Sequence, residues 1–158
     1  MLDRFARFSL AISEIDRCWH KLAAEEMAKY ALKSPHAVYL NTLYQYSEGI
    51  TAAKLCELCC KNKADVSRMV TILEKKGLVR KEEGVGGNRY RAKLLLTEEG
   101  KQAAKHVRER AAVAVELAGE GLSDADRDTF YRCLEQITEN LQELCKTGLP
   151  QQTAHQSK

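Results

Sequence analysis

One stretch of the chain, residues 51–96, constrains the fold more than any other because its local pattern changes from helix to strand. Thr51 and Asn62 each stand where a side-chain oxygen can cap a helix, and the two helices that they predict are short and separated by a brief turn. Gly77 marks the end of the second helix. Two short helices in this order predict a helix-turn-helix.

Strands are predicted directly after the second helix. Residues 78–83 and 89–96 have the composition of two strands, and the glycine-rich segment 84–88 between them predicts a turn. A helix-turn-helix followed by such a hairpin is a winged helix-turn-helix, whose second helix enters the major groove of DNA. The sequence therefore predicts a mainly α fold with a small β-hairpin wing.

The two ends of the chain carry apolar residues at alternating steps of three and four. These residues are Phe5, Phe8, Ile12, Ile15, Trp19 and Leu22 near the N-terminus, and Phe130, Leu134, Ile137, Leu141 and Leu144 near the C-terminus. The spacing places each set on one face of a long helix. Either helices from both ends form a homodimerisation unit, or each apolar face packs against the chain's own core.

We expect four parts along the chain. They are an N-terminal dimerisation helix, a winged helix-turn-helix DNA-binding lobe, C-terminal dimerisation helices and a disordered tail, at residues 1–33, 34–96, 97–147 and 148–158. Pro35 is expected at the first helical position of the lobe, Gly49 is expected to stop that helix, and Thr97 is expected to cap the helix after the hairpin.

Charge is distributed unevenly along the chain. The whole chain has a net charge of +3, but residues 54–93 contain 11 Lys or Arg against 5 Asp or Glu. A basic middle predicts a polyanionic partner, here double-stranded DNA. Aromatic residues make up only 6% of the chain, which leaves no large stacking platform for single-stranded nucleic acid.

The second short helix supplies most of the candidate DNA contacts. Val66, Val70 and Leu73 are expected on its inner face, so the other residues are free to face DNA. Together with the first helix and the hairpin, the candidates are Lys54, Lys63, Ala64, Asp65, Ser67, Arg68, Thr71, Arg89 and Arg91.

These candidates have different expected roles. Arg68 is expected to read a base, because a guanidinium group can bind guanine through two hydrogen bonds. Arg89 and Arg91 alternate with Tyr90, which places both on one face of the hairpin, where they can enter a narrow minor groove. Asp65 either caps the helix or accepts a hydrogen bond from cytosine.

Three stretches of this region, Asn62–Arg68, Leu73–Arg80 and Leu96–Gly100, resemble in order and spacing the multiple-antibiotic-resistance regulator (MarR) family. The resemblance implies a homodimeric DNA-binding regulator, usually a repressor of a pseudo-palindromic operator that a ligand or oxidation releases. It also implies an effector cleft between the dimerisation helices and the DNA-binding lobe. Trp19, His20 and Tyr39 are aromatic or polar enough to line that cleft.

The chain departs from the family pattern in its wing and in its first short helix. Asn88 and Tyr90 stand where the wing usually has aspartate and arginine, and Lys54 replaces a usual acid. These differences leave open a third interpretation, an interaction module that has lost specific DNA reading.

The cysteines and the missing enzyme motifs complete the analysis. Six cysteines at uneven spacings predict reduced thiols rather than disulfides, and no second cysteine pair completes a zinc site. Most of these thiols are expected to fill the core, with Cys18 or Cys60 as candidate redox sensors. We find no phosphate loop, no serine elbow and no membrane span, and we therefore expect a cytoplasmic protein that is not an enzyme and needs no cofactor or metal.

Overall fold

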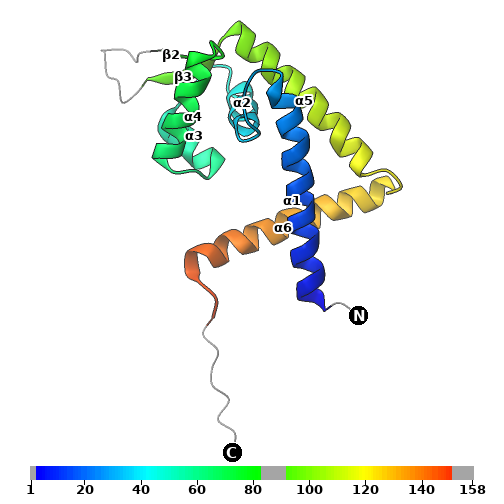
Figure 1. Ribbon diagram of the computed structural model, residues 1–158. Helices are drawn as coiled ribbons and strands as arrows, with labels where there is room; N and C mark the ends of the chain where they lie inside the picture. The colour runs from blue at the N-terminus through cyan, green and yellow to red at the C-terminus, as the bar shows by residue number, and fades with distance from the viewer. Residues whose placement is uncertain (1–2, 83–91, 151–158) are drawn as a thin grey trace, which may run out of the picture. The chain divides into compact units, whose positions relative to one another are not determined.

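The computed structural model of the chain describes residues 3–82 and 92–150 (Figure 1). Its helices and strands are α1 (Arg4–Ala28), α2 (His36–Gln45), β1 (Ile50–Thr51), α3 (Ala52–Cys59), α4 (Lys63–Lys75), β2 (Val79–Glu82), β3 (Lys93–Leu96), α5 (Glu98–Ala118) and α6 (Asp124–Thr147). This mainly α architecture with a small antiparallel sheet confirms the predicted fold class.

Contacts divide the chain into two compact units, Met1–Ala114 and Val115–Lys158, and the division falls within α5. The first unit contains the sheet and helices α1 to α4. In the second unit, Arg127 closes the turn that precedes α6, because its guanidinium binds Glu116 Oε2 at 2.7 Å and the Gly119 carbonyl at 2.9 Å.

Side-chain caps start four of the helices as predicted. Thr51, Asn62, Thr97 and Ser123 each accept a hydrogen bond from a backbone N–H in the first turn of the helix that follows. Each bond satisfies an amide that the helix itself leaves without a partner. The ends predicted from glycine are confirmed at Gly77 and Gly148, which follow the last turns of α4 and α6.

The boundaries of α2 differ from the prediction. Pro35 is the residue before the helix rather than its first residue, and α2 ends at Gln45 instead of continuing to Gly49. Gly49 has a positive φ of 73° and leads directly into β1, and a Cβ there would lie 2.7 Å from the side chain of Leu95. Gly49 therefore serves the close approach of β1 to β3 and not the end of a helix.

The sheet has the strand order β1-β3-β2, with all neighbours antiparallel. Val79 pairs with Leu96 and Glu82 with Lys93, which confirms the predicted hairpin over the described parts of its strands. The turn at 84–88 and both wing arginines lie outside the described residues. The strand β1 was not predicted, because two residues are too few to show a strand period.

One apolar core holds the first unit together. Met27, Leu40, Leu55, Leu73 and Leu94 are each at most 1% exposed and come from α1, α2, α3, α4 and β3 respectively. Because every one of these elements contributes a buried side chain, the core fixes α4 and the sheet against the rest of the unit.

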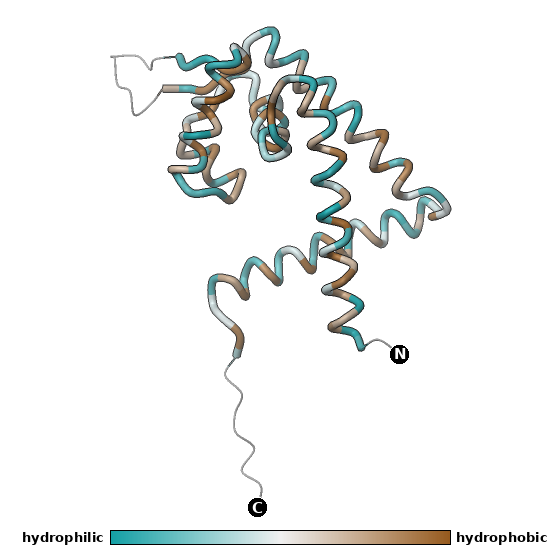
Figure 2. The backbone as a smooth tube through the Cα atoms, in the orientation of Figure 1, coloured by the Kyte–Doolittle hydropathy of each residue, from teal (hydrophilic) through white to brown (hydrophobic). Residues whose placement is uncertain are grey.

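The apolar faces of α1 and α6 have a different fate. All six apolar residues of the predicted N-terminal set are exposed, from 41% at Phe8 to 76% at Phe5. In α6 no residue is buried, and Phe130, Ile137, Leu141 and Leu144 are exposed. Figure 2 shows hydrophobic residues recurring among hydrophilic ones along both helices. The apolar side chains named here are therefore exposed to solvent within the described residues.

Two further expectations concern the ends of the chain and membranes. Most of the predicted disordered tail, residues 151–158, lies outside the described residues. Over the described ranges, the structure has no helix that is long and apolar enough to span a membrane.

Candidate nucleic-acid interface

Helix α4 has one buried face and one open face. Val66, Val70 and Leu73 are at most 3% exposed, which confirms the predicted inner face of this helix. The helical period then turns the intervening residues outward. The outward residues are Lys63, Ala64, Ser67, Arg68 and Thr71, all of them exposed. The structure thus brings the α4 candidates together on one exposed surface.

A chain of hydrogen bonds runs along the first two turns of α4. The Asn62 amide donates to Asp65 Oδ2 at 2.7 Å, and the backbone N–H of Asp65 donates to Asn62 Oδ1 at 2.9 Å. Arg68 Nη2 donates to the other carboxylate oxygen, Oδ1 of Asp65. Asp65 therefore takes part in the cap, which is one of its two predicted roles. It also forms an ion pair with Arg68. The ion pair with Arg68 was not predicted, although the spacing of three residues allows it.

The other candidates have local partners or lie outside the description. Lys54 Nζ binds Glu57 Oε1 at 2.9 Å, and this hydrogen bond and charge raise the pKa of Lys54. The Thr71 hydroxyl donates to the Ser67 carbonyl at 2.8 Å, within its own helix. Arg89 and Arg91 fall in the range that the structure does not describe.

The end of α4 is joined tightly to the start of α5. The Thr97 hydroxyl donates to the Gly77 carbonyl at 2.6 Å, and the Thr97 N–H donates to the Leu78 carbonyl at 3.0 Å. Gly100 lies so close that a Cβ on it would be 1.9 Å from the Leu78 carbonyl oxygen. These contacts hold the end of α4 close to the start of α5.

A cavity of about 160 Å³ lies between α1, the start of α2 and α5. Its lining is mostly apolar and consists of Trp19, Leu22, Ala23, Glu25, Glu26, Ala37, Val107, Arg110, Ala111 and Ala114. Trp19 is the predicted effector residue that lines it. His20 is exposed and binds Asp16 of its own helix, and Tyr39 is 2% exposed within the core, where burial raises its pKa. The structure does not bring these three residues together.

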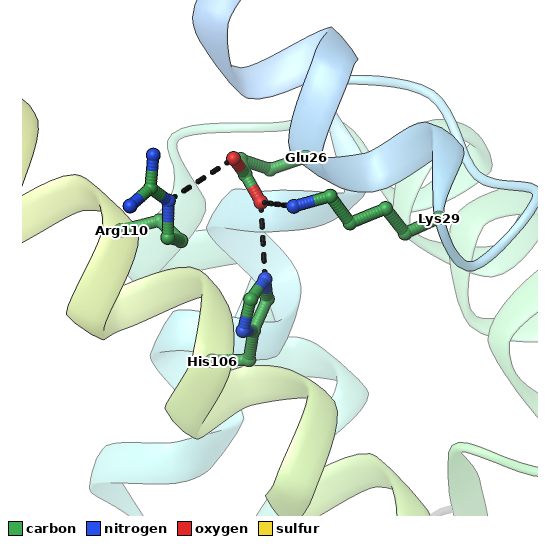
Figure 3. Close-up of polar contacts among 4 residues, drawn as sticks. All are labelled: Glu26, Lys29, His106 and Arg110. Atoms are coloured by element: carbon green, nitrogen blue, oxygen red, sulfur yellow. Dashed lines mark hydrogen bonds and ion pairs between the residues drawn. The ribbon is translucent and has the colours of Figure 1, made fainter.

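Glu26 is the centre of a polar cluster at one wall of this cavity (Figure 3). Its carboxylate receives Lys29 Nζ at 2.5 Å, His106 Nε2 at 3.0 Å and Arg110 Nε at 3.2 Å. The hydrogen bond from Lys29, helped by those from His106 and Arg110, lowers the pKa of Glu26 to about 2. The cluster ties α1 to α5. It was not predicted, because its members are separated by most of the first unit in sequence.

The cysteines are free thiols in different surroundings. Cys59 is buried, its Sγ lies 3.7 Å from Thr42 Oγ1, and burial raises its pKa. Cys56 is partly buried, whereas Cys18 and Cys60 are exposed. Within the described residues, no group of His, Cys, Asp and Glu side chains is arranged to hold a metal ion.

A model of the MarR family matches residues 32–89, from the start of α2 through both helices of the helix-turn-helix and into the wing. Over these residues the chain is similar to the MarR family. The match confirms the resemblance predicted from the sequence, and members of this family are transcriptional regulators, not enzymes.

Solved structures of MarR-family regulators share the fold. A transcriptional regulator from Methanosarcina mazei Go1 is 23% identical, with a TM-score of 0.77 over 87% of this chain and 97% of its own. A putative regulator from Listeria monocytogenes, complexed with DNA, is 23% identical, with a TM-score of 0.78 over 96% of this chain and 99% of its own.

A third similar structure contains a small molecule. CouR from Rhodococcus jostii RHA1, bound to p-coumaroyl-CoA, is 17% identical, with a TM-score of 0.69 over 82% of this chain and 90% of its own. A search of curated proteins gives no match.

Proposed function

We propose that the protein is a cytoplasmic homodimeric repressor that binds a pseudo-palindromic DNA operator and is released by a small-molecule effector. The main support for DNA binding is the arrangement of α4. Three buried side chains anchor this helix, and it presents Lys63, Ser67 and Arg68 to solvent. A dimer would place two copies of α4 in major grooves about one helical turn apart. The structural relative from Listeria monocytogenes is complexed with DNA, which supports DNA as the partner.

The unburied faces of α1 and α6 support a dimer built from both ends of the chain. Exposed Phe5, Ile15, Leu141 and similar side chains are costly in water unless a partner covers them. In this proposal residues 1–33 and 97–147 associate with those of a second copy, and residues 34–96 form the DNA-binding lobe.

The cavity beside Glu26 supports an effector site. Its volume of about 160 Å³ is that of a site for a compact apolar ligand of about one ring. The cavity lies between α1 and α5, and Thr97 at the start of α5 is hydrogen-bonded to Gly77 and Leu78 at the end of α4. A ligand in the cavity could therefore change the position of α4. CouR, which is bound to p-coumaroyl-CoA, shares the fold.

The test is binding of the reduced, purified protein to genomic DNA fragments at near-physiological salt. We expect recovery of a palindromic site and a steep loss of affinity as salt is raised, because phosphate contacts release counterions. No enriched fragment, or a flat dependence on salt, would contradict the proposal and favour an interaction module without specific DNA reading.

Thiol sensing is the second candidate function, and the exposure of Cys18 and Cys60 supports it. The discriminating measurement repeats the fragment binding after mild peroxide treatment, with Cys18→Ser and Cys60→Ser variants. Loss of binding that either variant prevents would assign release to oxidation. Unchanged binding would leave release to a small molecule.

A further inference from the structure

A carboxylate stands in the middle of the basic outward surface of α4, where it would repel DNA phosphates. We propose that Asp65 is a positioning residue that holds the Arg68 guanidinium ready to read guanine and thereby sets the base specificity of α4. This inference rests on the proposed DNA-binding function and assigns Asp65 a role beyond helix capping.

The Asp65 carboxylate is itself held in place. Asn62 binds it from one side, through an amide donor at 2.7 Å, and the backbone N–H of Asp65 is bound to the same Asn62 side chain at 2.9 Å. The Asp65 side chain is 34% exposed, whereas that of Arg68 is 72% exposed. Asp65 is therefore the fixed member of the pair, and Arg68 is the member that extends into solvent.

The geometry leaves Arg68 able to bind a second group. A guanidinium has five N–H donors in one plane, and Arg68 donates to Asp65 through Nη2. Fixing one edge of the plane orients the remaining donors, and guanine needs two of them for its O6 and N7 atoms. An arginine that is already oriented loses less rotamer freedom on binding than a free one.

A stabilising role alone does not account for this arrangement. An exposed ion pair three residues apart on a helix adds little to stability. The same carboxylate weakens attraction to every phosphate, whatever the DNA sequence. Asp65 should therefore lower non-specific affinity while raising affinity for the correct site.

The two roles predict different results for Asp65→Ala. Loss of a positioning residue should weaken binding to the correct site and strengthen binding to unrelated DNA, which reduces the ratio of the two affinities by about tenfold. Loss of a cap alone should affect both DNAs equally, because the whole helix is weakened.

The experiment starts with the duplex that the wild-type protein selects from a random-sequence pool, with a scrambled duplex as reference. Dissociation constants are measured for both duplexes with wild type, Asp65→Ala, Asp65→Asn and Glu14→Gln. Asp65→Asn retains a group that can cap but removes the charge. Glu14→Gln is the matched control, because Glu14 pairs with Arg17 at the same spacing on α1 and carries the same charge.

We expect the affinity ratio to fall in both Asp65 variants and to stay unchanged in Glu14→Gln. In an Arg68→Ala background, Asp65→Ala should change the ratio by less than about twofold, because its effect acts through Arg68. Replacing guanines of the selected duplex with 7-deazaguanine should weaken wild-type binding at one position per half-site and have little effect on Asp65→Ala.

The outcomes separate the two proposals. If the wild-type protein selects no duplex, the DNA-binding function is wrong, and the role of Asp65 is overturned with it. If it selects a duplex, two results would leave the DNA-binding function standing and overturn the role of Asp65. One is that Asp65→Ala keeps the wild-type affinity ratio. The other is that Asp65→Ala lowers the ratio as much in the Arg68→Ala background as in the wild-type protein.

Discussion

Helices α4 and α6 begin in the same way and end in different surroundings. Each starts with a polar cap whose side chain binds an aspartate three residues later, Asn62 with Asp65 and Ser123 with Asp126. Each also carries apolar residues on one face. Yet α4 buries three of them, and α6 buries none. Local sequence thus determines that a helix forms, whereas what covers its apolar face depends on the rest of the chain or on a partner.

The largest expected effect comes from a substitution on the buried face of α4. Leu73→Ala should lower the free energy of unfolding by about 2–5 kcal/mol, because Leu73 is fully buried and its removal leaves a cavity in the core. Urea denaturation followed by circular dichroism measures the change. A cost below about 1 kcal/mol would show that α4 is not anchored as described.

The exposed side is tested by a charge on α6. Ile137→Asp should weaken self-association by at least about tenfold, because it places a carboxylate in the apolar face that a second copy would cover. Sedimentation equilibrium measures the dimer dissociation constant. Glu139→Gln, on the same helix, is the control and should leave the constant unchanged. Equal dimerisation of both variants would place the interface elsewhere.

The polar link between α1 and α5 predicts a pH effect. Because the pKa of Glu26 is lowered to about 2, its ion pairs stabilise the fold above the ordinary carboxyl pKa and lose this effect as the pH falls toward 2. Glu26→Gln should therefore cost about 1–2 kcal/mol at neutral pH and less at acidic pH. Thermal unfolding across this range provides the measurement.

The control for the Glu26 variant is Glu14→Gln. Glu14 also has a lowered pKa, but both it and its partner Arg17 are exposed to water. We expect almost no change in stability from this variant, since exposed pairs are screened. An equal loss in both variants would contradict the special role of the Glu26 cluster.

The last prediction compares two helix caps, whose expected effects differ by about 1 kcal/mol or less. Thr97→Val should cost about 1–2 kcal/mol, because it removes the cap of α5 and the hydrogen bond to the Gly77 carbonyl outside that helix. Ser123→Ala removes the cap of α6 and the exposed hydrogen bond from Ser123 to Asp126, both within the cap itself, and should cost about 1 kcal/mol. Thr97→Ser keeps both bonds and serves as the control. A smaller loss from Thr97→Val than from Ser123→Ala would show that the α4–α5 joint adds no stability.

Features that depend on neighbouring residues were predictable from the sequence. The caps at Thr51, Asn62 and Thr97, the inner face of α4 and the paired strands all follow from spacings within a few residues. Features that join distant residues were not. His106 is 80 residues from Glu26, and no periodic pattern relates the two.

The candidate site shows the same division. The exposed surface of α4 was predicted, since helical spacing alone separates it from Val66 and Val70. The lining of the cavity was predicted only at Trp19, because three helices form the cavity and its lining includes Val107 and Arg110, far along the chain from Trp19. The wing arginines stay a prediction.

Because residue 100 is glycine, α5 packs directly against the backbone at Leu78. Gly100 lies against the Leu78 carbonyl, and no larger residue fits there unless α5 moves away from Leu78. From this point to Arg110, α5 extends about 15 Å as a single rigid rod. A displacement of about 1 Å at Arg110 corresponds to a rotation of about 4° about Gly100, which contacts Leu78 just after the end of α4. The absence of a Cβ at Gly100 thus lets a small movement of α5 at Arg110 act on the end of α4.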